Sequence, residues 1–301
     1  MASARGSMAG AGVARIPQGS GVVPAPATPF DGAGGDLTPS EFRRVCDLLY
    51  KVCRITLGEG KQPLVKARLW KRIRSLGMQT YTEYFTFVES REGKPELLSM
   101  VDALTTNKTS FFREAAHFDF LKEELVTHFK TANRLRIWCA GCSSGQEPYT
   151  LAIVLQEALT PAQRSDTLIL ATDISSKILT AAREGVYDDE EVDGVSPQQL
   201  RRWFTPGRDG AKTEHRVNDE LRRMIRFARL NLMEAWSMRG PFDFIFCRNV
   251  MIYFDRPTQE NLVRRFYGLL RPGGCLLVGH SESLTGRVEG LTYVRPAVYR
   301  K

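Results

Sequence analysis

The chain has 301 residues, and its 42 lysine and arginine residues outnumber the 34 aspartate and glutamate residues, which gives a formal net charge of +8. Apolar residues make up 43% of the sequence and charged residues 25%, as in soluble globular proteins, so a collagen-like repeat and extensive disorder are excluded for most of the chain. This length allows two domains. The apolar runs are far shorter than the roughly 20 residues that cross a bilayer, and we expect no membrane insertion.

The six cysteines are too few for a disulfide framework in a chain of this length, and they indicate a reducing, cytoplasmic setting. Cys139 and Cys142 have C-x-x-C spacing, but no second pair and only four histidines accompany them. We therefore expect no metal site and interpret these cysteines as small buried side chains.

The N-terminal third divides into a tail and a helical domain. Residues 1–36 are rich in Gly, Ala, Pro and Ser, and they predict a disordered tail because they offer little apolar surface to bury. From Thr38, a capping residue before Pro39, apolar residues recur with helical spacing to about residue 102. This pattern predicts an all-helical domain over residues 37–105.

One helix of this domain, after Pro63, carries a run of basic residues. Six of them fall between Lys61 and Arg74 with no acid among them. Most charge runs are solvated helix faces. Because no acid balances these residues, a docking surface for an acidic partner is here as good an interpretation as a solvated face. The residues assigned to that surface are Lys66, Arg68, Lys71, Arg72 and Arg74.

Residues 106–301 have the sequence pattern of an α/β domain. Short apolar runs alternate with amphipathic segments, which predicts a parallel sheet covered by helices on both faces. Two short β-rich runs at the C-terminus suit an antiparallel pair at the sheet edge. A charged, turn-rich stretch at about residues 188–229 interrupts the pattern and predicts a small inserted β-subdomain. The strands expected from the apolar runs are 135–140, 168–172, 225–230, 242–247, 275–278, 291–295 and 297–300.

Ligands of such sheets bind at the loops after the strands. The first loop opens with Gly141, which lets the backbone approach a ligand, and ends in Glu147. An acid there disfavours the pyrophosphate of a nicotinamide cofactor and favours a cationic ligand such as S-adenosylmethionine, although a plain helix-capping carboxylate is the alternative. Asp173, at the end of the next strand, can accept hydrogen bonds from both hydroxyls of a ribose.

Two further loops indicate the rest of the ligand and its acceptor. Asn231 and Leu232 suit the edge and the face of an adenine. Arg248 follows the strand that ends at Cys247, where methyltransferases acting on base amines show a different motif. Its planar guanidinium, together with that of Arg113, points to an acidic acceptor.

Five blocks in register give the sequence a specific resemblance to the CheR family, the glutamate methyltransferases of bacterial chemoreceptors. They are TNKTSFFR (106–113), CSSGQEP (142–148), ATDIS (171–175), FCRNVMIYF (246–254) and GHSES (279–283). The resemblance covers the chain from about Thr38 onward. It implies an N-terminal helical domain, a seven-stranded Rossmann-like methyltransferase sheet and an inserted β-subdomain.

The same resemblance implies a cofactor, a site and partners. S-adenosylmethionine would be converted to S-adenosylhomocysteine, with Arg113 and Tyr253 nearest the transferred methyl group. The basic helix would face the methylation helices of a chemoreceptor, and in some members the β-subdomain also holds a receptor C-terminal peptide. The resemblance also implies that the enzyme is cytoplasmic and is recruited to membrane receptor arrays. Its cofactor contacts would be Asn107, Thr109, Arg113, Gly141, Glu147, Asp173, Asn231, Leu232, Arg248 and Asn249.

Other functions remain open from the residues alone. A nucleic-acid methyltransferase would use the net positive charge on phosphates, although the base-amine motif is missing and we expect no nucleic-acid partner. A methyltransferase for another small substrate, or an adaptor that binds the cofactor without turnover, would retain the same motifs. A nicotinamide dehydrogenase conflicts with Glu147.

Overall fold

The computed structural model describes residues 36–129, 134–210, 212–284 and 289–301, which lie in one compact unit, Gly34–Lys301. The predicted disordered tail, apart from Asp36, lies outside the described residues. None of the described helices is long and apolar enough to span a membrane.

The N-terminal part is all-helical, as predicted. Its first helix is capped by Thr38, whose side chain accepts a hydrogen bond from the Glu41 backbone while the Glu41 carboxylate accepts one from the Thr38 backbone. Leu49, Leu69 and Phe85 are fully buried in an apolar core shared by the helices. The elements are α1 (Pro39–Cys53), η1 (Glu59–Lys61), α2 (Gln62–Ser75), α3 (Tyr81–Glu89) and α4 (Lys94–Leu104).

A seven-stranded sheet follows, with strand order β6-β2-β1-β7-β8-β10-β9. The first five of these strands are parallel, and β10 and β9 are antiparallel at one edge, as the sequence predicted. The strands are β1 (Leu135–Ala140), β2 (Thr167–Asp173), β6 (Ile225–Arg229), β7 (Phe242–Cys247), β8 (Leu270–Val278), β9 (Thr292–Arg295) and β10 (Val298–Arg300).

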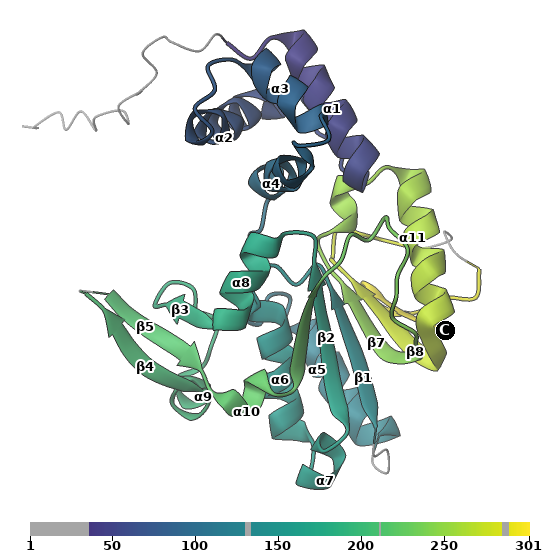
Figure 1. Ribbon diagram of the computed structural model, residues 1–301. Helices are drawn as coiled ribbons and strands as arrows, with labels where there is room; N and C mark the ends of the chain where they lie inside the picture. The colour runs from purple at the N-terminus through teal and green to yellow at the C-terminus, as the bar shows by residue number, and fades with distance from the viewer. Residues whose placement is uncertain (1–35, 130–133, 211, 285–288) are drawn as a thin grey trace, which may run out of the picture. The chain divides into compact units, whose positions relative to one another are not determined.

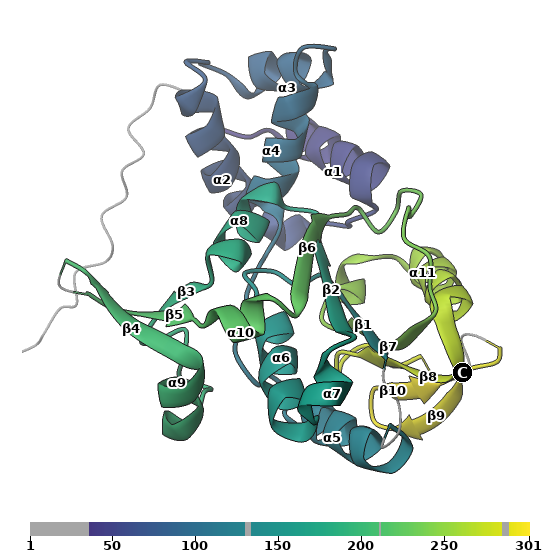
Figure 2. The ribbon, with the colours of Figure 1, turned by 60° about the horizontal axis from the view of Figure 1, so that its bottom comes forward.

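Helices cover both faces of this sheet. Because successive strand residues point to opposite faces, Ile137 and Cys139 of β1 join one core, while Trp138 and Ala140 join the other. Figures 1 and 2 show α5 and α6 on one face and α11 on the other. The helices around the sheet are α5 (Ala116–His128), α6 (Gln146–Ala158), α7 (Pro161–Arg164), α8 (Ser176–Glu184) and α11 (Arg256–Leu269).

The inserted subdomain is a three-stranded antiparallel sheet in the order β3-β5-β4, formed by β3 (Val186–Asp188), β4 (Phe204–Asp209) and β5 (Lys212–Val217). It is accompanied by α9 (Pro197–Trp203) and α10 (Asp219–Arg222). The expected range of about 188–229 differs from this sheet at both ends, since β3 begins earlier and β6 belongs to the large sheet. Pro206 lies within β4, where a proline is tolerated because β4 is an edge strand.

Candidate functional site

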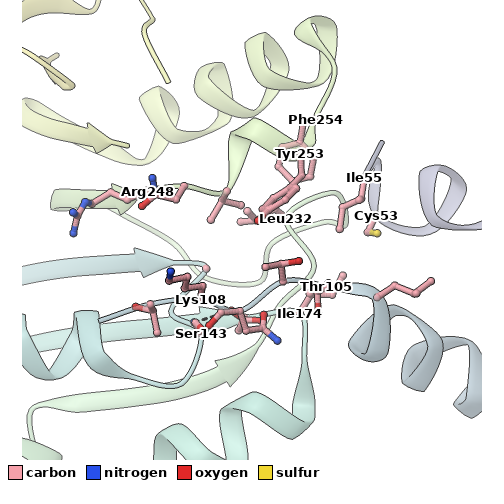
Figure 3. A pocket seen from close by; sticks show the side chains of 18 of the residues that line it. Cys53, Ile55, Thr105, Lys108, Ser143, Ile174, Leu232, Arg248, Tyr253 and Phe254 are labelled. Carbon is pink, nitrogen blue, oxygen red and sulfur yellow. Dashed lines mark hydrogen bonds between the residues drawn. The ribbon is translucent and has the colours of Figure 1, made fainter. Parts of the chain in front are cut away.

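One pocket lies where the parallel strands end, and the predicted site residues converge on it (Figure 3). It is bounded by the segment after α1, by residues 104–113 and by the loops after β1, β2, β6 and β7. All the residues predicted to bind the cofactor or to act in catalysis line it. They are Asn107, Thr109, Arg113, Gly141, Glu147, Asp173, Asn231, Leu232, Arg248, Asn249 and Tyr253.

Gly141 and Asp173 line the pocket at the ends of β1 and β2. Gly141 has a φ of +93°, and a Cβ atom there would lie 2.4 Å from the Cγ2 atom of Val250, so only glycine fits. The Asp173 carboxylate accepts hydrogen bonds from the backbone N–H groups of Ser143 (2.9 Å) and Ser175 (3.0 Å). Burial raises its pKa, and these N–H groups counteract that effect. The carboxylate thus aligns two loops and retains acceptor sites for a ligand.

Arg248 does not present its guanidinium to a substrate, contrary to the prediction that it would bind an acidic acceptor. Its Nη1 atom lies 2.8 Å from Glu147 Oε2 and its Nη2 atom 3.2 Å from Glu114 Oε2, and the side chain is only 1% exposed. Burial acts to raise the pKa of Glu114, but the charge and hydrogen bonding of Arg248, together with Asn249 and His280, hold that pKa below its usual range. The N–H donors of the guanidinium are thus engaged by carboxylates of the protein itself.

The resulting Glu114–Arg248–Glu147 cluster has two carboxylates and one guanidinium, an excess of one negative charge. Glu147, which also accepts a hydrogen bond from Cys139 Sγ at 2.9 Å, is therefore not a free carboxylate. The excess negative charge of the cluster suits a cationic group near Glu147, while Lys61, Lys108 and Arg113 line other parts of the same pocket. The sequence assigned this preference to Glu147 alone, whereas in the structure the carboxylate belongs to a cluster.

Arg113 is placed differently from Arg248. It lies in the pocket wall, and its guanidinium donates a hydrogen bond from Nη1 to the Lys108 carbonyl at 3.0 Å. Among the described residues no side chain pairs with it. Since a guanidinium has five N–H donors, most of them remain available to a ligand.

Asn231 also differs from its predicted role. Its amide nitrogen donates to the Val52 carbonyl of α1 at 2.8 Å and to Glu234 Oε1 at 3.3 Å, and its amide oxygen accepts from the Met233 backbone at 3.0 Å. Both amide donors are therefore used within the protein, and an adenine edge cannot take them. The neighbouring Leu232 lines the pocket with apolar surface, as predicted.

The helical domain completes the pocket, which the motifs did not indicate. Cys53, Ile55 and Lys61 line the pocket, and Figure 3 shows the first two beside Tyr253 and Phe254. The backbone carbonyl of Tyr253 accepts hydrogen bonds from the Thr56 backbone (2.9 Å) and hydroxyl (3.1 Å). No motif in the sequence marks these contacts, because they join residues about 200 positions apart.

Glu282 explains the fifth sequence block, for which the motif alone gave no role. Its buried carboxylate accepts hydrogen bonds from the backbone N–H groups of Gly279 (2.6 Å), Asn249 (2.8 Å) and Ile252 (3.1 Å). Burial raises its pKa, against the effect of these donors. Glu282 therefore holds the loop that carries Arg248 and Asn249, in which Asn249 has a left-handed φ of 59°.

Glu114, His117 and His280 bring three potential metal-ligand atoms within 4.8 Å of one another, a grouping that the sequence did not reveal. The Glu114 carboxylate already pairs with Arg248, so a divalent cation would share it with a buried positive charge. Burial, followed by the Arg248 charge, lowers the pKa of His117 to about 4. The absence of a metal site stays a prediction.

The pocket suits a nucleoside that carries positive charge. Asp173 stands where a ribose binds in open parallel sheets, and the turn after β1 leads to the carboxylate of Glu147 where a pyrophosphate would need donors. S-adenosylmethionine has this combination of ribose and positive charge, and it has no phosphate. The fold and pocket therefore define an S-adenosylmethionine-dependent methyltransferase.

Comparison with known proteins narrows this class. Residues 40–105 match the all-alpha domain of CheR methyltransferase, and residues 107–298 match its SAM binding domain. The chain belongs to the CheR methyltransferase family.

Several known proteins are similar in sequence to this chain over most of its length. A chemotaxis protein methyltransferase of Salmonella typhimurium is 40% identical over 87% of this chain and 90% of its own. A probable chemotaxis protein methyltransferase of Rhizobium etli is 42% identical over 80% of this chain and 92% of its own. Chemotaxis protein methyltransferase 2 of Pseudomonas aeruginosa is 41% identical over 87% of this chain and 93% of its own.

The low pKa of His117 predicts a pH dependence of stability. The folded chain keeps this 1% exposed histidine neutral down to about pH 4, whereas the unfolded chain protonates it near pH 6.5. Below about pH 6.5 the unfolded state binds more protons, so the free energy of unfolding falls as the pH falls toward 4. At pH 5 we expect a loss on the order of 2 kcal/mol from this residue.

Urea denaturation at pH 7 and pH 5 measures this loss. The His117→Gln variant should lose about 2 kcal/mol less than the wild type between the two pH values, whatever its stability at pH 7. The matched control is His128→Gln, which replaces a surface histidine at the end of the same helix. Equal pH dependence in wild type and His117→Gln would contradict the prediction.

Proposed function

We propose that this methyltransferase modifies glutamate side-chain carboxylates of chemoreceptors and forms methyl esters during chemotactic adaptation. One observation carries the proposal: Arg113 lines the pocket, and among the described residues its guanidinium makes a single hydrogen bond, to the Lys108 carbonyl. Its remaining donors suit a carboxylate. The names of the similar proteins, all chemotaxis protein methyltransferases, support the same substrate class.

The reaction needs little acid–base chemistry from the protein. A glutamate side chain has a pKa of about 4.3 and is already ionised at pH 7, so no general base is required. When bound, S-adenosylmethionine supplies an electrophilic methyl group, and its transfer to the acceptor leaves S-adenosylhomocysteine. The protein's contribution is then positioning and electrostatics. We propose that Arg113 orients the acceptor carboxylate or the cofactor and that Tyr253 lines the path of the methyl group.

The cofactor would be held by the loops at the strand ends. In this proposal Asp173 binds the ribose, and the excess negative charge of the Glu114–Arg248–Glu147 cluster favours the positive charge of the cofactor. Leu232 offers its side chain to the adenine. Asn231, Arg248 and Asn249 would contribute through backbone groups or by positioning, since their side chains have partners within the protein. The remaining proposed contacts are Asn107, Thr109, Arg113, Gly141 and Glu147.

We propose a division of labour along the chain. Residues 37–105 dock the methylation helices of a receptor, and residues 106–301 carry the reaction. The edge strand β4 has one unpaired side in its sheet, which suits a receptor C-terminal peptide added as a further strand. In this proposal the enzyme is cytoplasmic and is recruited to membrane receptor arrays through these contacts.

The test of this function follows the methyl group. The full chain is incubated with methyl-labelled S-adenosylmethionine and receptor-containing membranes, and the products are treated with mild alkali. We expect label on the receptor that is released as volatile methanol, because carboxyl methyl esters hydrolyse in alkali. Alkali-stable label would indicate a different acceptor. Cofactor binding without transfer would indicate an adaptor.

Arg113 should dominate turnover in this assay. We expect the Arg113→Ala variant to transfer methyl groups on the order of 10²-fold more slowly, the scale of losing one preorganised donor. Arg264→Ala is the matched control, because Arg264 is a 62% exposed side chain on α11 and does not line the pocket. Near-normal turnover of Arg113→Ala would remove Arg113 from the proposed machinery.

The proposed docking surface is smaller than the basic run in the sequence. Lys66 forms an ion pair with Asp36, and Arg68 donates to two backbone carbonyls at the end of α4. Arg72 pairs with Glu96, a buried carboxylate that also accepts a hydrogen bond from a tyrosine hydroxyl. Acids absent from the local sequence are thus supplied by the tertiary structure. Lys71 and Arg74 are exposed and have no such partner among the described residues.

Charge reversal of Lys71 and Arg74 together should lower receptor methylation by about tenfold or more, since like charges facing an acidic partner oppose binding. Calorimetric binding of S-adenosylmethionine should be unchanged. The control variant reverses the exposed Arg239 and Arg264, which gives the same change in net charge away from α2. Unchanged methylation by the Lys71→Glu, Arg74→Glu variant would mean that this surface is merely solvated.

A further inference from the structure

Arg113 is held in an unusual backbone turn. The residues on either side of it, Phe112 and Glu114, have φ angles of 53° and 56°. Left-handed conformations are costly for residues with side chains, and they persist only where surrounding contacts impose them. The contacts around this turn therefore determine how Arg113 enters the pocket.

The N-terminal side of the turn is fixed by packing and by one hydrogen bond. The Phe112 backbone N–H donates to Thr150 Oγ1 at 3.2 Å. The buried ring of Phe111 packs edge-on against Tyr187 and Phe204, with centroids 5.0 Å and 5.6 Å away. The ring of Phe111 therefore serves core packing.

The C-terminal side of the turn is fixed by charge. Arg248 Nη2 donates a hydrogen bond to the backbone carbonyl of Arg113 and lies 3.2 Å from the Glu114 carboxylate. Asn249 Nδ2 donates to the other Glu114 oxygen at 3.3 Å. Glu147 holds Arg248 from the opposite side at 2.8 Å. One guanidinium thus joins the Arg113 turn to the start of α6 and to the loop after β7.

Glu114 itself is outside the pocket wall, in contrast to Glu147, Arg248 and Arg113. Its side chain is 13% exposed, and its contacts are with the protein. Apart from the charge that it adds to the cluster, Glu114 can therefore affect the reaction only through another residue.

We propose that Glu114 is a positioning residue for methyl transfer: it holds Arg248 against the Arg113 carbonyl and thereby fixes the direction in which the Arg113 guanidinium enters the pocket. This inference rests on the proposed function of Arg113. The physical requirement is preorganisation, because a displacement of about 1 Å in a positioned group can cost on the order of 10²-fold in rate.

The Glu114→Gln variant tests this role because it keeps the length of the side chain and removes its charge. We expect kcat for receptor methylation at saturating S-adenosylmethionine to fall about 10-fold to 100-fold, a larger change than the rise in KM for S-adenosylmethionine that follows from removing one negative charge from the cluster. Because Glu114 acts through Arg113, adding Glu114→Gln to Arg113→Ala should cause little further loss. Losses that multiply in the double variant would overturn the proposal.

A structural readout accompanies the kinetics. In a crystal structure of Glu114→Gln, Arg248 should turn toward Glu147, and the Arg113 carbonyl should lose its guanidinium partner. An Arg113 turn that superposes on the wild-type turn would overturn the proposal even if the wild type fails to methylate receptors. Absence of transfer by the wild type, by contrast, contradicts the proposed function alone.

A control variant separates positioning from lost stability. Asp243 is a buried carboxylate that pairs with Arg271 at 2.6 Å and accepts from the Arg136 backbone at 2.7 Å, and neither it nor these partners line the pocket. Asp243→Asn should lower the thermal midpoint and leave kcat at the wild-type level. If Asp243→Asn lowers kcat as much as Glu114→Gln at a similar loss of midpoint, the effect of Glu114 is one of stability and the proposal fails.

Discussion

A guanidinium buried between two carboxylates is the interaction on which the site depends. Arg248, 1% exposed, lies between Glu114 and Glu147 and also reaches the backbone of Arg113. An unpaired charge at such depth would cost several kcal/mol, so each partner requires the others to be in place. Through this cluster the segment before α5, the first turn of α6 and the loop after β7 become one rigid unit.

The pocket is complete only with the helical domain. Hydrogen bonds from Asn231 to the end of α1, from Thr56 to the Tyr253 carbonyl, and from Tyr50 to Asp255 join that domain to the loops of the sheet. Leu64, in the first turn of α2, lines the same pocket. The helix proposed to meet the receptor therefore begins at the wall of the pocket in which the methyl group would be transferred, so recognition and chemistry share one structural element.

Much of the fold could be predicted because its determinants are local. The bounds predicted for β1 and β7 from their apolar runs are those observed in the structure. Thr38 before Pro39 correctly predicts the start of the first helix. The candidate site was found for a related reason, since strand ends bring their loops to one edge of a parallel sheet. Predictions of individual roles were less successful. The sequence predicts ligand contacts for the side chains of Arg248 and Asn231, whereas in the structure Glu114, Glu147 and a distant backbone carbonyl engage their donors.

The sequence by itself determined the elements, their alternation and the residue types at the ends of the strands, because periodicity and loop chemistry act over short distances. Only the tertiary structure decided which of those polar groups face a ligand and which face one another. The basic run of α2 illustrates the difference: Asp36 and Glu96 pair with Lys66 and Arg72 from positions 24 to 30 residues away. A donor's partner depends on distances in space, and spacing along the chain does not specify them.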